Sequence, residues 1–145
     1  MKYIYYSITT AALVLGLCYW SWSHNTQYRT VVMTMGGEPF TTEVADTPAL
    51  QQLGLSYRKS IGPNNAMLFV FGMPGDYKFW MKDMNFPLDI IWLSSDKKII
   101  YIKKDLSPQT YPQSFGPATS TQYVIEVAQG TVERLKLVPS QVVSW

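Results

Sequence analysis

Alternating and continuous runs of apolar residues predict a chain built mainly from β-strands. Apolar and polar positions alternate on both sides of Gly36-Gly37, which predicts a hairpin over residues 30–45. Residues 67–71 (MLFVF) are apolar throughout, as expected of a strand buried in the centre of a sheet. Further strands are predicted in the segments KFWM (78–81), DIIWL (89–93), KIIYIKK (98–104), QYVIEVA (122–128) and QVVSW (141–145).

Short helices are predicted between some of these strands. Thr47 is a candidate N-cap, Pro48 suits the first helical position, and Gly54 suits the stop after ALQQL. Gly130-Thr131 similarly precedes a short helix, VERLKL. Residues 105–120 hold three prolines and are predicted to be a long irregular loop. The expected fold is α+β and mostly β: a compact bent sheet or small barrel with two or three short helices.

The segment FWMKDMNFPLDII (79–91) places charges where the chain is most apolar. If residues 79–84 are extended, alternate side chains share a face. One face would then hold Phe79, Met81 and Asp83, and the other Trp80, Lys82 and Met84. Pro87 interrupts the strand, and Asp89 begins the next face together with Ile91 and Leu93.

The first 23 residues predict a membrane segment. Lys2 precedes an uncharged run that ends in Tyr19, Trp20 and Trp22, and about twenty such residues span a bilayer. A retained single-span anchor is the favoured interpretation. A signal peptide cleaved near Ser21-Trp22-Ser23 is the main alternative, and a buried helix of the globular domain is a third.

These features divide the chain into an N-terminal anchor or signal peptide (1–23), a polar linker (24–28) and one domain (29–145). The domain is expected on the extracytoplasmic side, in the periplasm or at the cell surface. Cleavage of the signal would instead secrete it. The expected partners are the membrane, through the N-terminal helix, and a small molecule, glycan or protein.

Composition excludes several classes of function. The net charge is +2, far from the dense basic face that nucleic-acid binding needs, so no nucleic-acid partner is expected. The only cysteine is Cys18 and the only histidine is His24, both near the N-terminus. No Cys/His zinc set and no Ser-His-Asp or Cys-His pair is therefore available to the domain. No metal or cofactor is expected.

Four ordered motifs give the chain a family resemblance. They are GLSYR (54–58), AMLFVF (66–71), FWMKDMNFPLDI (79–90) and YVIEVAQGT (123–131). With these motifs the chain resembles the family known as domain of unknown function 192, DUF192, from about Thr30 to Val143. The resemblance implies a small, mostly β domain, often with an N-terminal signal or anchor. It implies no established activity.

The chain departs from the family pattern at several positions, of which Asp83 matters most. Asp83-Met84 stands where the family usually has Asn-Thr. An ionised carboxylate only accepts hydrogen bonds, whereas an amide also donates them. A role implied for the family's Asn therefore does not carry over directly to Asp83.

Two interpretations of the charged segment stay open. In the first, the charges are structural: Arg58 pairs with Asp83 or Asp89, and Lys82 extends past Trp80 into solvent. In the second, they form the polar floor of an aromatic-walled cleft, a common form of ligand site. The candidate ligand-binding residues are Arg58, Trp80, Lys82, Asp83 and Asp89.

The favoured function is a non-enzymatic ligand-binding or accessory module tethered at the membrane. The alternative is a carboxylate-based hydrolase acting on cell-envelope polymers, which needs Asp83, Asp89 or Glu126 with a raised pKa in a cleft. Glu126 itself is expected to point out of its strand or to pair with a base. A third possibility is an assembly partner that uses exposed sheet edges and aromatic side chains. No catalytic residue is assigned.

Overall fold

The structure is a computed structural model, and it describes residues 27–145. The membrane segment expected at 1–23 lies outside the described residues, as does most of the linker expected at 24–28. Within residues 27–145, no helix is both long enough and apolar enough to cross a bilayer.

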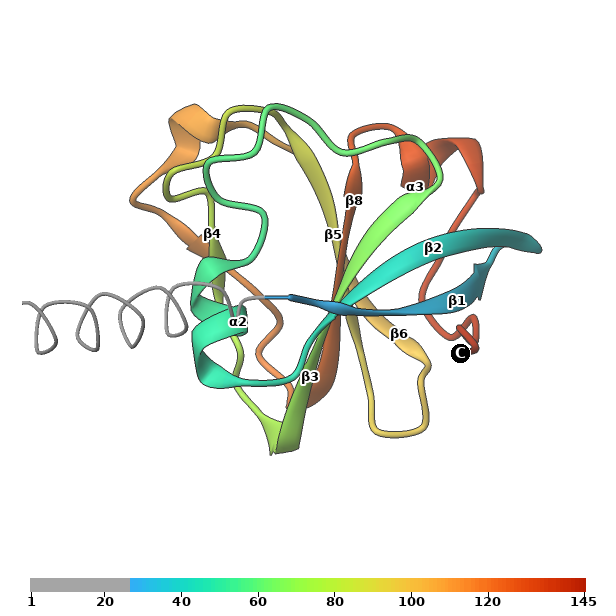
Figure 1. The fold of residues 1–145 in the computed structure, drawn as a ribbon. Coiled ribbons are helices and arrows are strands. Elements are labelled where there is room, and N and C mark those ends of the chain that lie inside the picture. The colour runs from blue at the N-terminus through green and yellow to red at the C-terminus, as the bar shows by residue number, and fades with distance from the viewer. Residues whose placement is uncertain (1–26) are drawn as a thin grey trace, which may run out of the picture.

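One bent, six-stranded sheet forms most of the fold (Figure 1). Its strands, in spatial order, are β1 (Arg29–Met35), β2 (Glu38–Ala45), β3 (Asn65–Gly75), β8 (Thr121–Ala128), β5 (Leu88–Leu93) and β6 (Ile99–Leu106). A separate two-stranded ribbon joins β4 (Phe79–Trp80) to β7 (Ser114–Phe115). The helices are short: α2 (Pro48–Leu53), the 3-10 turn η1 (Pro108–Thr110) and α3 (Thr131–Arg134). The mostly β, α+β prediction is confirmed.

The hairpin and the first helix follow the predicted local signals. β1 and β2 pair antiparallel, and Gly36 and Gly37 both have positive φ in the turn between them. The Thr47 side chain accepts a hydrogen bond from the Leu50 N–H at 3.3 Å, and Pro48 opens α2. Helix α2 then connects β2 to β3, which pair parallel. As predicted, β3 is an interior strand.

The central strands bury side chains on both faces of the sheet. Leu68, Ile125 and Ile91 lie side by side on neighbouring strands within one apolar cluster. One residue further along, Phe69, Val124 and Trp92 lie side by side within a second cluster on the opposite face. This second face carries the candidate functional site.

The strand predicted over residues 78–81 is reduced to β4, and the extended conformation considered for residues 79–84 is wrong beyond Trp80. Residues 82 and 83 form a turn, and Asp83 takes a left-handed backbone conformation, with φ of 56°. Such a residue cannot continue an extended strand. The predicted sharing of faces by Met81, Asp83, Lys82 and Met84 is therefore wrong as well.

The sheet is bent but open, so the barrel alternative is wrong. Its two edges, β1 and β6, do not pair with each other. The strand predicted for QVVSW is also wrong, because this segment forms only isolated bridges, Thr34 with Ser144 and Lys98 with Val142. These bridges place the C-terminal segment across both edges.

Two other predicted elements differ in extent. The predicted helix VERLKL reduces to α3, which ends at Arg134. The region predicted as an irregular loop, 105–120, contains the end of β6, the turn η1 and strand β7. Strand β7 pairs with β4, so contacts with Phe79 and Trp80 order part of this region.

Candidate functional site

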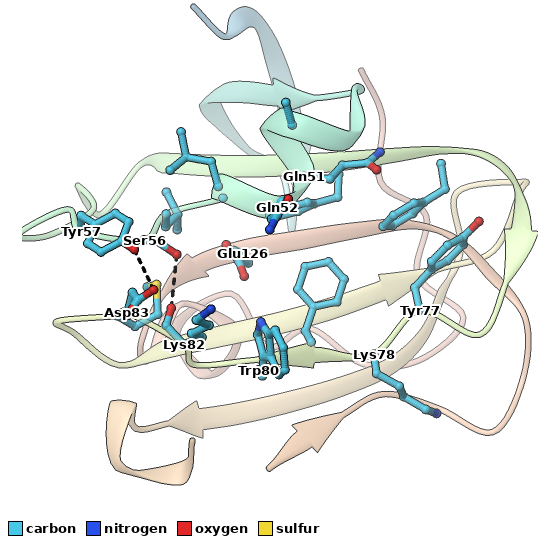
Figure 2. Close-up of a pocket in the computed structure, with 18 of the residues that line it drawn as sticks. Gln51, Gln52, Ser56, Tyr57, Tyr77, Lys78, Trp80, Lys82, Asp83 and Glu126 are labelled. Atoms are coloured by element: carbon cyan, nitrogen blue, oxygen red, sulfur yellow. Dashed lines mark hydrogen bonds between the residues drawn. The ribbon is translucent and has the colours of Figure 1, made fainter. Parts of the chain in front are cut away.

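A pocket of about 620 Å³ lies on the second face of the sheet (Figure 2). One wall comes from α2 and the residues that follow it, 49–57, and the other from residues 76–84. Phe69 of β3 and Glu126 of β8 also line it. Figure 2 shows Glu126 between the two walls, with Gln51 and Gln52 on one side and Trp80 and Lys82 on the other. The volume is within the range typical of small-molecule sites, roughly 300–1,000 Å³.

Glu126 is a buried carboxyl group in an otherwise apolar layer. In the sheet it lies between Met67 of β3 and Ile90 of β5, and its residue surface is only 5% exposed. Among the described residues, no group forms a hydrogen bond with its Oε2 atom. An unpartnered buried polar atom costs free energy unless a water molecule, an ion or a ligand satisfies it.

Burial also changes the acidity of Glu126. Loss of solvent raises the pKa of Glu126 to about 8, and the positive charge of Arg58 lowers it only in part. At neutral pH the carboxyl group is therefore mostly protonated and uncharged. In that state it both donates and accepts a hydrogen bond, and a basic partner would convert it to a carboxylate.

Hydrogen bonds join the two walls at one end of the pocket. The Tyr57 hydroxyl donates to Asp83 Oδ2 at 2.8 Å, and the Tyr57 N–H donates to the Asp83 carbonyl at 2.9 Å. Ser56 Oγ donates to the Lys82 carbonyl at 3.2 Å (Figure 2). The bond to Asp83 raises the pKa of the Tyr57 hydroxyl. Tyr57 and Asp83 both have positive φ, so two strained residues hold this junction.

Trp80 and Lys82 lie on the exposed side of the pocket. Trp80 is 53% exposed, and its ring meets that of Tyr111 edge-on at 5.8 Å between centroids. Lys82 Nζ lies 6.0 Å from the centre of the Trp80 ring. Three predicted site residues, Trp80, Lys82 and Asp83, thus line the same pocket. Their role in binding a ligand stays a prediction.

Arg58 lies behind the pocket and is already paired. The pairing expected with Asp83 or Asp89 is wrong, since the guanidinium binds Glu43 of β2 through two hydrogen bonds, at 3.0 and 2.5 Å. It also lies over the Tyr28 ring, 5.4 Å from its centre. The Oδ2 atom of Asp83 instead accepts from the Tyr57 hydroxyl. Arg58 therefore contributes charge near Glu126 without lining the pocket.

Asp89 supports the scaffold on the opposite face of the sheet. It is fully buried, and its two carboxylate oxygens accept from the N–H groups of Asp105 and Val132, each at 3.0 Å. Val132 is in the first turn of α3, whose N-cap, Gly130, has no side chain to cap it. Asp89 therefore supplies the missing cap and ties β6 and α3 to β5.

Glu126 was expected to point out of its strand or to pair with a base, and both expectations are wrong. The available signal was its setting: a single carboxyl residue inside the apolar run YVIEVA. Strands in the centre of a sheet covered on both sides read as nearly continuous apolar runs. A lone Glu in such a run is therefore buried whichever face it takes.

The backbone at Gly54 shapes the wall beside Glu126. Gly54 has φ of 52° and ψ of −133°, a region that residues with a side chain rarely adopt. We expect Gly54→Ala to destabilise the fold by about 2 kcal/mol and to weaken any ligand bound in the pocket. Gly72→Ala, whose added carbon would meet no atom, is the matched control. Equal urea midpoints for the two variants would contradict this prediction.

The described residues contain no group of three or more His, Cys, Asp or Glu side chains arranged to hold a metal ion. Comparison with known protein families shows which family this chain is related to. The profile of DUF192, described as an uncharacterized ACR, matches residues 31–145. The chain belongs to the DUF192 family. Every motif that carried the resemblance lies within the matched range.

Two solved structures resemble this DUF192 chain. A protein from Sinorhizobium meliloti 1021, described as a "putative transcription regulator", has 30% sequence identity and a TM-score of 0.76, over 81% of this chain and 95% of its own. A protein of unknown function from Novosphingobium aromaticivorans DSM 12444 has 28% identity and a TM-score of 0.77, over 84% and 89%. No curated protein matches the chain.

Proposed function

We propose that this DUF192 chain is a non-enzymatic ligand-binding or accessory module, tethered at the membrane by residues 1–23, with its ligand site in the Glu126 pocket. The observation that carries the proposal is the buried Glu126, whose Oε2 atom has no hydrogen-bond partner within residues 27–145, in a pocket lined by several aromatic side chains. Apolar pockets with a few convergent polar groups are the usual form of a small-molecule site. The tether is supported by the uncharged N-terminal run alone.

The walls support binding because they are held in place without a ligand. Hydrogen bonds join them at the Tyr57–Asp83 end, and Phe71 stacks on Tyr77 at 3.5 Å between ring centroids. Phe69 and Phe79 meet edge-to-face at 4.8 Å. A pocket formed in advance spares the ligand the cost of ordering it.

A fragment screen tests the proposal on the full chain in mild detergent, with binding followed by NMR. We expect small aromatic fragments to shift the Trp80 indole signal and the amide signals of β8. Trp80→Ala should weaken these fragments about tenfold or more, since a half-exposed Trp contributes packing area to the ligand rather than to the core. Val32→Ala, an exposed apolar residue on β1, is the control. Binding that is unchanged in Trp80→Ala would place the ligand elsewhere and contradict the proposal.

A carboxylate-based hydrolase acting on cell-envelope polymers is the second candidate. The raised pKa of Glu126, to about 8, within a pocket favours it. Of the three carboxylates considered, Asp83 and Glu126 line this pocket, whereas Asp89 lies on the other face of the sheet with both oxygens occupied. Release of soluble fragments from peptidoglycan, abolished in Glu126→Gln, would favour the hydrolase over the binding module.

No nucleic-acid function is proposed. The description of the Sinorhizobium meliloti protein as a regulator concerns that protein. The present chain has a net charge of only +2, which gives little electrostatic attraction to a phosphate backbone.

A further inference from the structure

We propose that the pocket receives the positively charged nitrogen of an organic ligand, an ammonium or guanidinium group, against the Glu126 carboxylate. This inference rests on the proposed binding function and names its ligand class. The hydrogen-bonding capacity of the pocket, the charges around Glu126 and the aromatic walls each support it.

Several polar groups of the pocket leave an acceptor free, while the Gln52 amide and the Lys82 ammonium group also line it as donors. Gln51 donates its amide N–H groups to the carbonyls of Val70, at 2.8 Å, and Ala45, at 3.4 Å, so its own carbonyl oxygen remains available. The Tyr77 hydroxyl donates to the Met73 carbonyl at 2.7 Å. Glu126 adds its Oε2 atom, which has no partner in the described part of the chain. A ligand group rich in N–H donors complements such a surface.

The cations nearest to Glu126 are already engaged or lie at the rim. Arg58 is bound to Glu43, and Lys78 binds Asp76 at 2.7 Å and the Pro117 carbonyl at 2.6 Å. Lys82 is exposed and lies over Trp80. The side chains beside Glu126 on β3 and β5, Met67 and Ile90, carry no charge.

The charges that line the pocket therefore favour the binding of one cation. With Glu126 ionised, the pocket is lined by three carboxylates (Asp76, Asp83 and Glu126) and two ammonium groups (Lys78 and Lys82). Tyr57 and Tyr77 also line the pocket, and Tyr28 and Glu43 lie behind the wall beside Arg58. A buried carboxylate is stable only with a compensating partner, and a ligand cation would supply one.

The walls offer aromatic rings to the same cation. Phe69, Phe79 and Trp80 all line the pocket. The face of an aromatic ring attracts an ammonium or guanidinium group, and Trp does so most strongly. Rings and carboxylate together select a cation over a neutral group of the same shape.

The proposal fixes the sign of the pH dependence. The pKa of free Glu126 is raised to about 8, so below that pH the cation must displace the carboxyl proton when it binds. Affinity for a cation should therefore rise with pH, by up to about tenfold per unit, and level off above 8. A neutral ligand that instead accepts a hydrogen bond from the protonated carboxyl group would bind more weakly as the pH rises.

The test measures binding of benzylammonium and of its neutral isostere, benzyl alcohol, to the full chain by calorimetry at pH 6.0 and 8.5. We expect benzylammonium to bind on the order of fifty-fold more tightly at pH 8.5, and benzyl alcohol to change little. Glu126→Gln keeps the shape of the side chain and should remove this pH dependence. If the variant does not fold, the comparison of the two ligands on the wild-type protein is sufficient to test the proposal.

A second arm distinguishes a free amine from an amine on a polypeptide. It compares benzylammonium with the acetylated peptide Gly-Gly-Lys-Gly-Gly and its norleucine analogue. The proposal is supported if either amine binds more tightly than its neutral counterpart, benzyl alcohol or the norleucine peptide, and shows the pH dependence above. If neutral fragments bind in the pocket and both amines do not, the proposal of a cationic ligand is contradicted. The proposed binding function is then still supported. If no compound binds in the pocket, both proposals fail.

Discussion

Glu126→Gln should stabilise the fold, and the gain should grow as the pH rises. The wild-type carboxyl group has its pKa raised from 4.5 to about 8 by burial, so the folded state holds a proton that the unfolded chain releases. The contribution of this group to stability is full below about pH 4.5 and is lost as the pH rises to 8. A neutral amide has no such loss.

The expected size makes this effect easy to detect. Each pH unit between the unfolded and folded pKa values changes the free energy of unfolding by about 1.4 kcal/mol, which accumulates to roughly 5 kcal/mol over the interval. Urea unfolding of wild type and Glu126→Gln at pH 5, 7 and 9 measures it. The free energies of unfolding of the two proteins should be most similar at pH 5 and should differ most at pH 9.

Taking the difference between the two proteins cancels the titration of all other groups. Glu133→Gln, which changes an exposed carboxylate on α3, is the matched control and should run parallel to wild type. If Glu126→Gln also runs parallel to wild type from pH 5 to pH 9, Glu126 is solvated rather than buried.

Asp89→Ala should destabilise the fold by about 3–5 kcal/mol at neutral pH, because it leaves two backbone N–H groups without their charged acceptor. The residue is fully buried, so water has little access to replace the lost bonds. Urea unfolding measures the loss. Near-UV circular dichroism should also report loosening around α3.

Asp46→Ala provides the comparison for this variant. Asp46 forms an ion pair with Arg29 at 3.0 Å, and both side chains are accessible to solvent, 59% of Arg29 and 37% of Asp46 being exposed. Surface pairs of this kind contribute about 1 kcal/mol at most. If Asp89→Ala proves as mild as Asp46→Ala, the role of Asp89 in joining β6 and α3 to β5 is contradicted.

Local signals in the sequence predict much of the fold. Gly36-Gly37, Thr47, Pro48 and Gly54 act within a few residues of themselves, and the structure follows each of them. The exceptions depend on distant contacts. Asp83 leaves the strand because Tyr57, 26 residues earlier in the chain, binds both its side chain and its carbonyl. No periodicity within residues 79–84 encodes that partner.

The site was predictable only in part for the same reason. Sequence reasoning placed Trp80, Lys82 and Asp83 near one another because they are neighbours in the chain. It could not separate Glu126 from Asp89, since both are acidic residues within apolar strands. Their faces are set by the register of β8 and β5, where Glu126 lies opposite Ile90 and Asp89 lies opposite Val127.

The left-handed conformation of Asp83 also limits how this family position can vary. Asn and Asp are the non-glycine residues that adopt positive φ most readily. Asp83 and the Asn that the family resemblance implies at this position both meet that backbone requirement, and the side-chain oxygen of either can accept from Tyr57. The exchange therefore preserves the turn while changing the charge beside the pocket.

The fixed walls of the pocket have a consequence for the rate of binding. Since hydrogen bonds hold one end and the Phe71–Tyr77 stack holds another part, a ligand meets a site that is already open. Binding then needs no slow rearrangement before or after the encounter. The observed rate should grow in proportion to ligand concentration, and differences in affinity among ligands should arise mainly from how long each one stays.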